Sequence, residues 1–229
     1  MPTVNLKETS RRDLNNQLHA LKKNTNETHW AVLNPDGQHS LVVGVDAAVT
    51  VEIKGHVGYY CAAMNKNAIV IIEGNAGVGV AENMMSGKVH VHGDASQSAG
   101  ATANGGLLVI DGNASARCGI SMKGVDIVVK GSIGPMSAFM AQSGNLVVLG
   151  DAGEALGDSI YEARIYVRGA VKSLGADCVQ KDMREEHREE LAKLLSAAGI
   201  NGEARPEDFR RYGSARKLYN FHIDNASAY

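Results

Sequence analysis

Apolar and polar side chains alternate in seven short stretches of the chain, and each stretch ends at a glycine. These glycines recur every 19 residues without interruption, at Gly55, Gly74, Gly93, Gly112, Gly131, Gly150 and Gly169. The positions four and two residues before each glycine all hold branched aliphatic residues: Val51/Ile53, Val70/Ile72, Val89/Val91, Leu108/Ile110, Ile127/Val129, Leu146/Val148 and Ile165/Val167. Because side chains alternate sides along a strand, both residues of each pair point to one face. A repeat of about 20 residues is typical of a solenoid, in which each unit buries its apolar face against the next.

The repeat continues beyond each glycine. The next position holds a turn-forming residue in the five inner repeats: Asn75, Asp94, Asn113, Ser132 and Asp151. His56 and Ala170 depart from this row at its two ends. The second position after the glycine is apolar or small: Val57, Ala76, Ala95, Ala114, Ile133, Ala152 and Val171. The seventh position is always alanine or glycine: Ala62, Ala81, Gly100, Gly119, Ala138, Gly157 and Ala176. These rows predict that the glycine is the hinge of a turn and that the interior is narrow.

The sequence therefore predicts an all-β protein, a single parallel β-helix of seven 19-residue coils with short flanking α-helices. Parallel strands lie about 4.8 Å apart, so seven coils would make a prism roughly 30 Å long. The left-handed hexapeptide β-helix is excluded, because its coils are multiples of six residues. We expect right-handed winding, which parallel crossovers generally adopt.

The flanking helices would cap the ends of the β-helix, where strand edges are otherwise unpaired. Ser10 and Asp13 predict the start of one helix near residues 11–22. Asp182 is the expected cap of a second helix that runs to about Ala198 and stops at Gly199. We divide the chain into an N-terminal helix and cap (1–39), the parallel β-helix (40–180), and a C-terminal helix and aromatic tail (181–229).

Two surfaces are candidates for contact with a partner chain. An apolar row lies on the outward face, three residues before the glycines: Ile71, Val109, Val128, Val147 and Tyr166. A stripe of this kind is usually covered, here by the helix 182–198 or by another protein. The second surface is the tail after Pro206, with the aromatic residues Tyr212, Tyr219, Phe221 and Tyr229. This tail would pack on its own β-helix or dock on a partner.

The outward row directly before the glycines carries most of the charge: Lys54, Glu73, His92, Asp111, Lys130, Leu149 and Arg168. Opposite charges neighbour one another at Lys54/Glu73 and at Asp111/Lys130, which predicts surface ion pairs between coils. The alternative hypothesis takes Glu73, His92 and Asp111, with His90 facing the same way, as an acid/base or metal constellation.

Composition narrows the functional classes. The 229 residues are 44% hydrophobic with a net charge of −2, which gives no electrostatic case for binding nucleic acid or an anionic membrane. No apolar run approaches 18 residues, and the N-terminus lacks the apolar stretch of a signal peptide, so we expect a cytoplasmic protein.

The three cysteines fit that compartment. Cys61 and Cys118 occupy the same repeat position three coils apart, roughly 14 Å, which exceeds the reach of a disulfide. Cys178 belongs to another row, and no Cys-x-x-Cys occurs. We expect buried, unreactive thiols without a metal.

No sequence motif assigns a catalytic, cofactor-binding or metal-binding residue to the chain. The Gly-x-x-Gly pairs and Gly77-Val-Gly79 belong to the repeat, and each leads into another strand rather than into a phosphate-binding helix. A Gly-x-Ser-x-Gly elbow, a His-Glu-x-x-His pair and a P-loop are all missing. A β-helix enzyme acting on polysaccharides remains an alternative, although the constant period leaves no inserted loop to form a substrate groove.

The units Ile-Glu-Gly-Asn-Ala-Gly, Val-His-Gly-Asp-Ala-Ser, Ile-Asp-Gly-Asn-Ala-Ser and Leu-Gly-Asp-Ala-Gly resemble the glycine-repeat (GXGXG) domain that ends the glutamate synthase large subunit. They lie at residues 72–77, 91–96, 110–115 and 149–153, and the resemblance covers roughly residues 40–180. A similar domain forms the C subunit of formylmethanofuran dehydrogenase. That subunit is a second alternative, which the long polar C-terminal extension disfavours.

Two further segments, Leu14-Asn-Asn-Gln-Leu-His-Ala-Leu21 and Leu218-Tyr-Asn-Phe-His-Ile-Asp-Asn225, look like the stand-alone glycine-repeat subunit of N-methylglutamate synthase, also called methylamine–glutamate N-methyltransferase. The resemblance implies a hetero-oligomer with an amidotransferase-like subunit and an FMN-binding, glutamate-synthase-like subunit, which converts glutamate and methylamine to N-methylglutamate and ammonia. In the glutamate synthase relatives the β-helix domain has no catalytic residues and braces the ammonia-producing and flavin domains, so the resemblance implies a non-catalytic role for this chain. The resemblance thus implies no cofactor in this chain, with FMN, and an iron–sulfur cluster as a further candidate, in a partner subunit.

Overall fold

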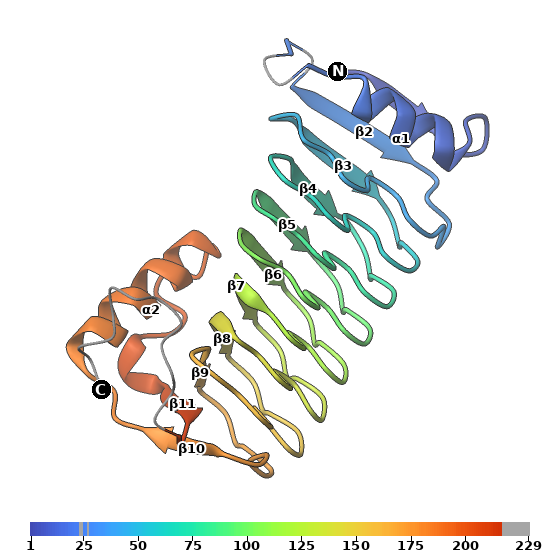
Figure 1. Cartoon of the computed structure of the whole chain (residues 1–229). Coiled ribbons are helices and arrows are strands. Elements are labelled where there is room, and N and C mark those ends of the chain that lie inside the picture. Colours follow the sequence, from blue (N-terminus) through green and yellow to red (C-terminus); the bar gives the residue numbers. More distant parts are fainter. Residues whose placement is uncertain (23–24, 27, 217–229) are drawn as a thin grey trace, which may run out of the picture.

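The computed structural model describes residues 1–22, 25–26 and 28–216, and it contains the predicted parallel β-helix (Figure 1). One strand precedes each of the seven repeat glycines: β3 (Thr50–Lys54), β4 (Ile69–Ile72), β5 (Lys88–Val91), β6 (Leu107–Ile110), β7 (Lys123–Val129), β8 (Ser143–Val148) and β9 (Arg164–Val167). These strands pair in parallel in chain order, each with its neighbour 19 residues away, as in Val51 with Val70. The fold class and the period are confirmed.

The core of the β-helix consists of the side chains that the repeat placed inward. All fourteen aliphatic residues four and two positions before the glycines have an exposed fraction of 0%. A second ladder of parallel bridges joins the residues two positions after the glycines, from Val57 through Ala76 to Val171. The chain therefore enters the core twice per coil, and each coil supplies only a few apolar residues to a core that all coils share.

The repeat glycines are required by the close approach of neighbouring coils. From Gly93 to Gly169, each glycine N–H donates a hydrogen bond to the carbonyl of the glycine one coil earlier, at 2.9–3.1 Å. A Cβ atom on Gly150 would lie 2.6–2.7 Å from the backbone of Gly131 and from Ser132 Oγ. Only Gly55 of the seven has a left-handed backbone, with φ of +140°. The chain bends at these glycines, as the predicted hinge of a turn requires, but the close approach of the coils rather than a left-handed backbone explains six of the seven.

The row after the glycines connects the coils through its side chains. The side-chain oxygen of each residue accepts a hydrogen bond from the backbone N–H one coil later, as Asn75 Oδ1 does from Asp94 at 2.9 Å. His56 belongs to this row, contrary to expectation, because its Nδ1 accepts from the N–H of Asn75 at 2.9 Å. Ala170 donates to Asp151 and has no side-chain acceptor to continue the row.

The alanine–glycine row has a backbone explanation beside the narrow interior. Six of its seven members adopt left-handed φ angles, from +54° at Ala62 to +69° at Gly119. For bulkier side chains this left-handed conformation has a higher conformational free energy. The same turns place buried alanines such as Ala81 and Ala138 against the core, with an exposed fraction of 0%.

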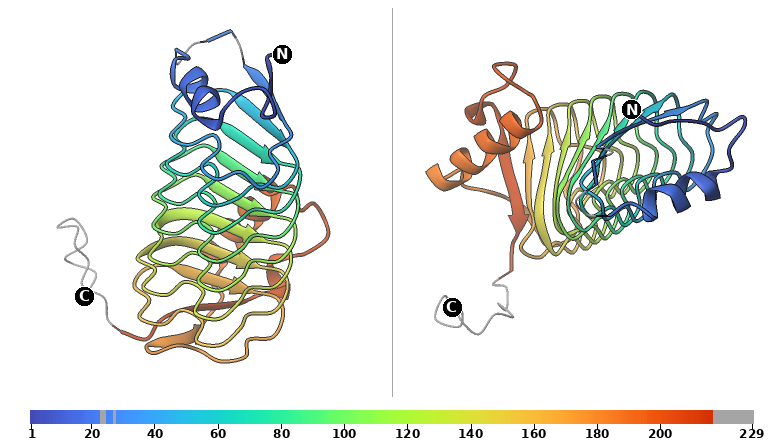
Figure 2. Two further views of the ribbon diagram at one scale, coloured as in Figure 1. Left: turned by 90° about the vertical axis from the view of Figure 1, so that its right-hand side faces the viewer. Right: turned by 90° about the horizontal axis from the view of Figure 1, so that it is seen from above.

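The N-terminal end is closed by one helix and two additional strands. The helix α1 (Arg11–His19) begins after Ser10, whose side chain accepts from the N–H of Asp13 as predicted, and it buries Leu14 and Leu18. It ends at His19, three residues before the predicted end. The strands β1 (Thr3–Asn5) and β2 (His29–Leu33) extend the parallel sheet into residues 1–39, the segment assigned to the N-terminal helix and cap. Figure 2 shows α1 across this end of the β-helix.

The C-terminal end is closed by a returning strand that the repeat did not indicate. The strand β11 (Arg210–Ser214) inserts antiparallel between β9 and β10 (Cys178–Lys181), so β10 does not continue the parallel ladder. Along the chain, the helix α2 (Glu185–Ala197) and the short 3-10 helix η1 (Pro206–Asp208) lie between β10 and β11. The edge of the last coil is therefore paired by the chain itself.

The second flanking helix begins later than predicted. Asp182 is not its cap, since α2 starts after Arg184, whose N–H donates to His187 Nδ1 at 3.2 Å. Its end is as predicted, because Gly199 follows with a left-handed φ of +78°. In Figures 1 and 2, α2 lies against the outside of the C-terminal coils.

The three cysteines are buried and unpaired with one another, as expected. Burial raises the pKa of the Cys61 and Cys118 thiols to about 12, and that of Cys178 to about 11. Such thiols are poor nucleophiles at neutral pH. Across the described residues, the helices are too short or too polar to span a bilayer.

The glycine row yields a stability prediction. Gly150→Ala places a methyl group against the backbone of the previous coil, which cannot move without breaking the ladder. We expect a loss of about 3 kcal/mol, seen as a lower midpoint of chemical denaturation. Gly213→Ala is the control, because its Cβ would meet nothing closer than 3.7 Å. Equal midpoints for the two variants would contradict this explanation of the row.

Candidate functional site

The outward face of strands β3–β9 contains the candidate site residues, and α2 divides it into two halves. The covered half comprises the outward residues of β6–β9 that pack against α2. The open half comprises the outward residues of β3–β5 and the residues directly after β4, β5, β6 and β7, which are Glu73, His92, Asp111 and Lys130. Lys88 Nζ on β5 donates to the carbonyl of Ala197 at 3.1 Å, so the end of α2 marks the boundary.

The covered half explains the apolar row. Val109, Val128, Val147 and Tyr166 have an exposed fraction of 0%. They form a second hydrophobic cluster with the apolar stripe of α2 and the residues after it: Leu191, Leu194, Leu195, Ala198, Ile200, Ala204 and Phe209. Of the two covers considered for the row, the structure has the chain's own helix. These four residues do not form an exposed docking surface, contrary to expectation, and only Ile71 of the predicted row lies in the open half.

Polar contacts fix α2 over the row. The hydroxyl of Tyr166 donates to Glu190 Oε2 at 2.8 Å, and Arg164 Nη1 contacts Glu190 Oε1 at 2.7 Å. Burial raises the pKa of Tyr166, and the hydrogen bond to Glu190 raises it further. A neutral phenol bound to a paired carboxylate anchors the centre of the helix to β9.

The aromatic tail is only partly described. Tyr212 has an exposed fraction of 4% and packs into the main core from β11, so it contacts its own β-helix rather than a partner. Tyr219 and Phe221 lie outside the described residues.

The open half begins with ion pairs. Lys54 Nζ lies 2.7 Å from both Glu52 Oε2 and Glu73 Oε1, as the sequence predicted for Glu73. Glu73 therefore does not join the histidines. Ile69, with an exposed fraction of 42%, and the partly exposed Ile71 lie on the same strand as an apolar patch beside these charges.

The histidine–aspartate cluster lies at the boundary with α2. His90 and His92 project from the same side of one coil, with ring centroids 4.3 Å apart. His90 Nε2 is 3.0 Å from Asp111 Oδ1, and His92 Nδ1 is 3.0 Å from Asp111 Oδ2. Lys130 Nζ lies 2.8 Å from Asp111 Oδ1, the second ion pair that the sequence predicted. The structure thus brings together three of the four residues of the proposed constellation.

The charge state of Asp111 follows from these contacts. Partial burial alone would raise the pKa of its carboxyl group, but the hydrogen bonds from His90 and Lys130 outweigh it and hold the pKa below the usual value. The aspartate is therefore an anion at neutral pH, shared by three nitrogen donors. In the described part of the chain, it completes the one group of three His, Cys, Asp or Glu side chains that is close enough to bind a metal ion.

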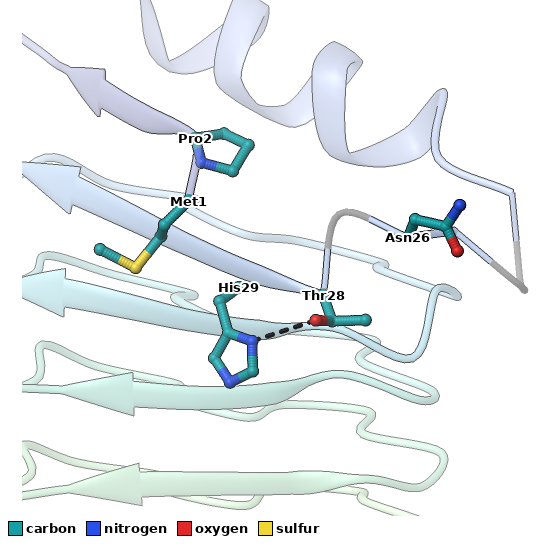
Figure 3. Close-up of a pocket in the computed structure, with 5 residues that line it drawn as sticks. All are labelled: Met1, Pro2, Asn26, Thr28 and His29. Atoms are coloured by element: carbon teal, nitrogen blue, oxygen red, sulfur yellow. Dashed lines mark hydrogen bonds between the residues drawn. The ribbon is translucent and has the colours of Figure 1, made fainter.

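Three hollows are lined by described residues, and none of the three includes a residue of this cluster. The hollow drawn in Figure 3, of about 690 Å³, lies where β1 and β2 begin and is lined by Met1, Pro2, Asn26, Thr28 and His29. Its polar contact is between Thr28 Oγ1 and His29 Nδ1, at 3.1 Å. The five lining residues include no carboxylate or cysteine, and they offer no pair of groups for acid/base catalysis.

A smaller hollow of about 250 Å³ lies at the C-terminal end, beside β9, β10 and β11. It is lined mainly by basic and small residues, including Arg164, Lys181, Arg211 and Arg216. Two of the four are paired, Arg164 with Glu190 and Arg216 with Asp177. Arg211 Nε donates to the carbonyl of Asp182 at 2.9 Å.

The fold and the site define the chain as a regular, helix-capped parallel β-helix protein. A scan against profiles of known protein families gives no match. The chain is 62% identical to protein GlxC of Rhizobium meliloti (strain 1021) over 229 residues, the full length of both proteins. The chain belongs to the GlxC family.

Asp126 beneath α2 provides a pH-dependent test of the covered half. Burial raises the pKa of its carboxyl group, the hydrogen bond from Asn145 Nδ2 at 2.9 Å opposes this, and the nearby Glu190 adds to the rise. Because the net native pKa is raised, the ionised carboxylate destabilises the fold as pH rises from the ordinary value of about 3.9 through the native value.

Asp126→Asn removes this penalty and keeps an oxygen that can accept from Asn145. We expect the variant to have a higher denaturation midpoint than the wild type at pH 7. The difference should shrink as the pH falls through about 3.9, because the wild-type carboxyl group then becomes protonated in both states. A variant that is less stable at pH 7 would show that the carboxylate stabilises the native state.

Proposed function

We propose that the chain is a non-catalytic scaffold subunit of a glutamate-synthase-like, FMN-dependent complex, and specifically of N-methylglutamate synthase. The observation that carries the proposal is the uninterrupted series of coils, whose glycine-repeat units resemble the brace domain of glutamate synthase. The full-length relationship to GlxC is compatible with a stand-alone subunit of this kind. The enzyme activity would belong to the complex, and this chain would contribute geometry.

The interior of the β-helix supports a structural role. Each coil fills its inside with aliphatic side chains that have no exposed surface, and the constant period inserts no long loop over β3–β9. A substrate groove on a β-helix needs side chains that line a depression, and the coils are too short to supply one. A polysaccharide-degrading activity therefore has little support.

A scaffold acts by positioning. We propose that the β-helix fixes the distance between an amidotransferase-like subunit and an FMN-binding subunit, so that an amine released at one site reaches the other before it diffuses away. Continuous hydrogen bonding between coils makes the β-helix stiff enough for this purpose. No cofactor is proposed for this role in the chain itself, and FMN would be held by the partner.

Purification of the tagged chain from its native cells tests the proposal. We expect two further chains in stoichiometric amounts, one of them yellow with bound FMN. The assembly should convert glutamate and methylamine to N-methylglutamate and ammonia. Recovery of the chain alone, with activity on uronic-acid polymers, would contradict the proposal.

Ile71 is the residue of the predicted docking row that remains accessible. We expect Ile71→Asp to reduce co-purification of a partner at least tenfold, because it places a charge in an apolar contact. Leu174→Asp is the control, since Leu174 is an exposed apolar residue of the last coil, with an exposed fraction of 37%. Unchanged recovery of both partners with Ile71→Asp would remove the open half from the interface.

A further inference from the structure

We propose that His90, His92 and Asp111 form a binding site for a divalent transition-metal ion of the zinc class. The three residues offer two imidazole nitrogens and a carboxylate, a ligand set that suits Zn²⁺ and related ions. The inference rests on the geometry of the cluster and does not depend on the proposed scaffold function.

The β-helix places the ligands by register. His90 and His92 are two residues apart, so both imidazoles leave the same face of the sheet. Asp111 follows β6 one coil later and stands beside His92, because Val91 pairs with Ile110 just before them. The backbone N–H groups of His92 and Asp111 donate to Ile72 and Val91 of the preceding coils at 3.0 and 2.8 Å. The ligand backbones are therefore held in place before any ion arrives.

The distances between the ligand atoms are close to those of a metal site. One ligand atom from each of His90, His92 and Asp111 lies within 4.8 Å of the other two, and both imidazoles already contact the carboxylate at 3.0 Å. Tetrahedral zinc with bonds of about 2.0–2.1 Å separates its ligands by roughly 3.3 Å. Small side-chain rotations would therefore open the cluster enough to admit an ion.

Lys130 occupies a position next to the proposed metal ligands. Its ammonium lies 2.8 Å from Asp111 Oδ1 and supplies the positive charge that a metal ion would bring to the carboxylate. The Lys130 side chain retains 27% of its exposure, so it can turn away into solvent when an ion binds. The lysine therefore competes with the metal, and its removal should strengthen binding.

A metal ion bound at this site would have one coordination position that the protein does not fill. Three protein ligands leave the fourth place of a tetrahedral ion for water or for a group from another molecule. The side chain of His92 is 47% exposed, so this place faces the solvent in the open half. Such a site can bind an ion in the free chain.

Titration of the purified, chelator-treated protein with Zn²⁺, followed by calorimetry, tests the inference. We expect one ion per chain, at least tenfold weaker binding in His90→Ala and in His92→Ala, and at least tenfold tighter binding in Lys130→Met. His29→Ala is the matched control, because His29 is an exposed strand histidine on β2, and its affinity should equal that of the wild type. Far-UV circular dichroism and denaturation midpoints check that each variant folds.

Co²⁺ gives a second readout, since its visible absorption reports nitrogen and oxygen ligation directly. Three results would overturn the site: no binding by the wild type, binding that persists in the His90→Ala/His92→Ala variant, or an affinity of Lys130→Met no greater than that of the wild type. The buried cysteines cannot account for binding that these substitutions abolish.

Discussion

The approach of one coil to the next at the repeat glycines is the constraint on which the structure depends. The glycine N–H groups bond to the glycine carbonyls of the preceding coil at about 3 Å, and no side-chain atom fits between them. This spacing keeps the strands, the second ladder of bridges and the side-chain row after the glycines in one register. A larger residue at any position from Gly93 to Gly169 would separate two coils and interrupt all three ladders at once.

This constraint explains how the two ends of the β-helix are closed and why only part of the outward face is covered. A stack of identical coils leaves an unpaired edge at each end, and the chain pairs them with β1 and β2 at one end and with β11 at the other. Stacking also aligns equal positions into rows, so that apolar outward residues become a continuous stripe. The helix α2 covers that stripe from Val109 to Tyr166, while the polar and histidine-containing coils before it stay accessible.

Much of the fold could be predicted from the sequence because its causes are local and repeated. The fourteen inward aliphatics, the cap at Ser10 and the stop at Gly199 each follow from a pattern of a few residues. The antiparallel return of β11 could not be predicted, because it depends on the packing of a distant segment against β9. The prediction that Asp182 caps α2 failed similarly, since the helix begins after Arg184, whose backbone N–H donates to His187 Nδ1. At the site, the row order correctly joined His92, Asp111 and Lys130, and it correctly paired Lys54 with Glu73. It could not decide whether Glu73 would also join the histidines, because that depends on the reach of the side chains.

Native-state hydrogen exchange measures the central claim most directly. If the glycine ladder holds the β-helix together, the amides of Gly93, Gly112, Gly131, Gly150 and Gly169 should exchange among the slowest of the chain, together with those of β4–β8 and later than those of α1 and α2. Glycine amides that exchange faster than the helices, or that open coil by coil without the neighbouring strands, would contradict the account.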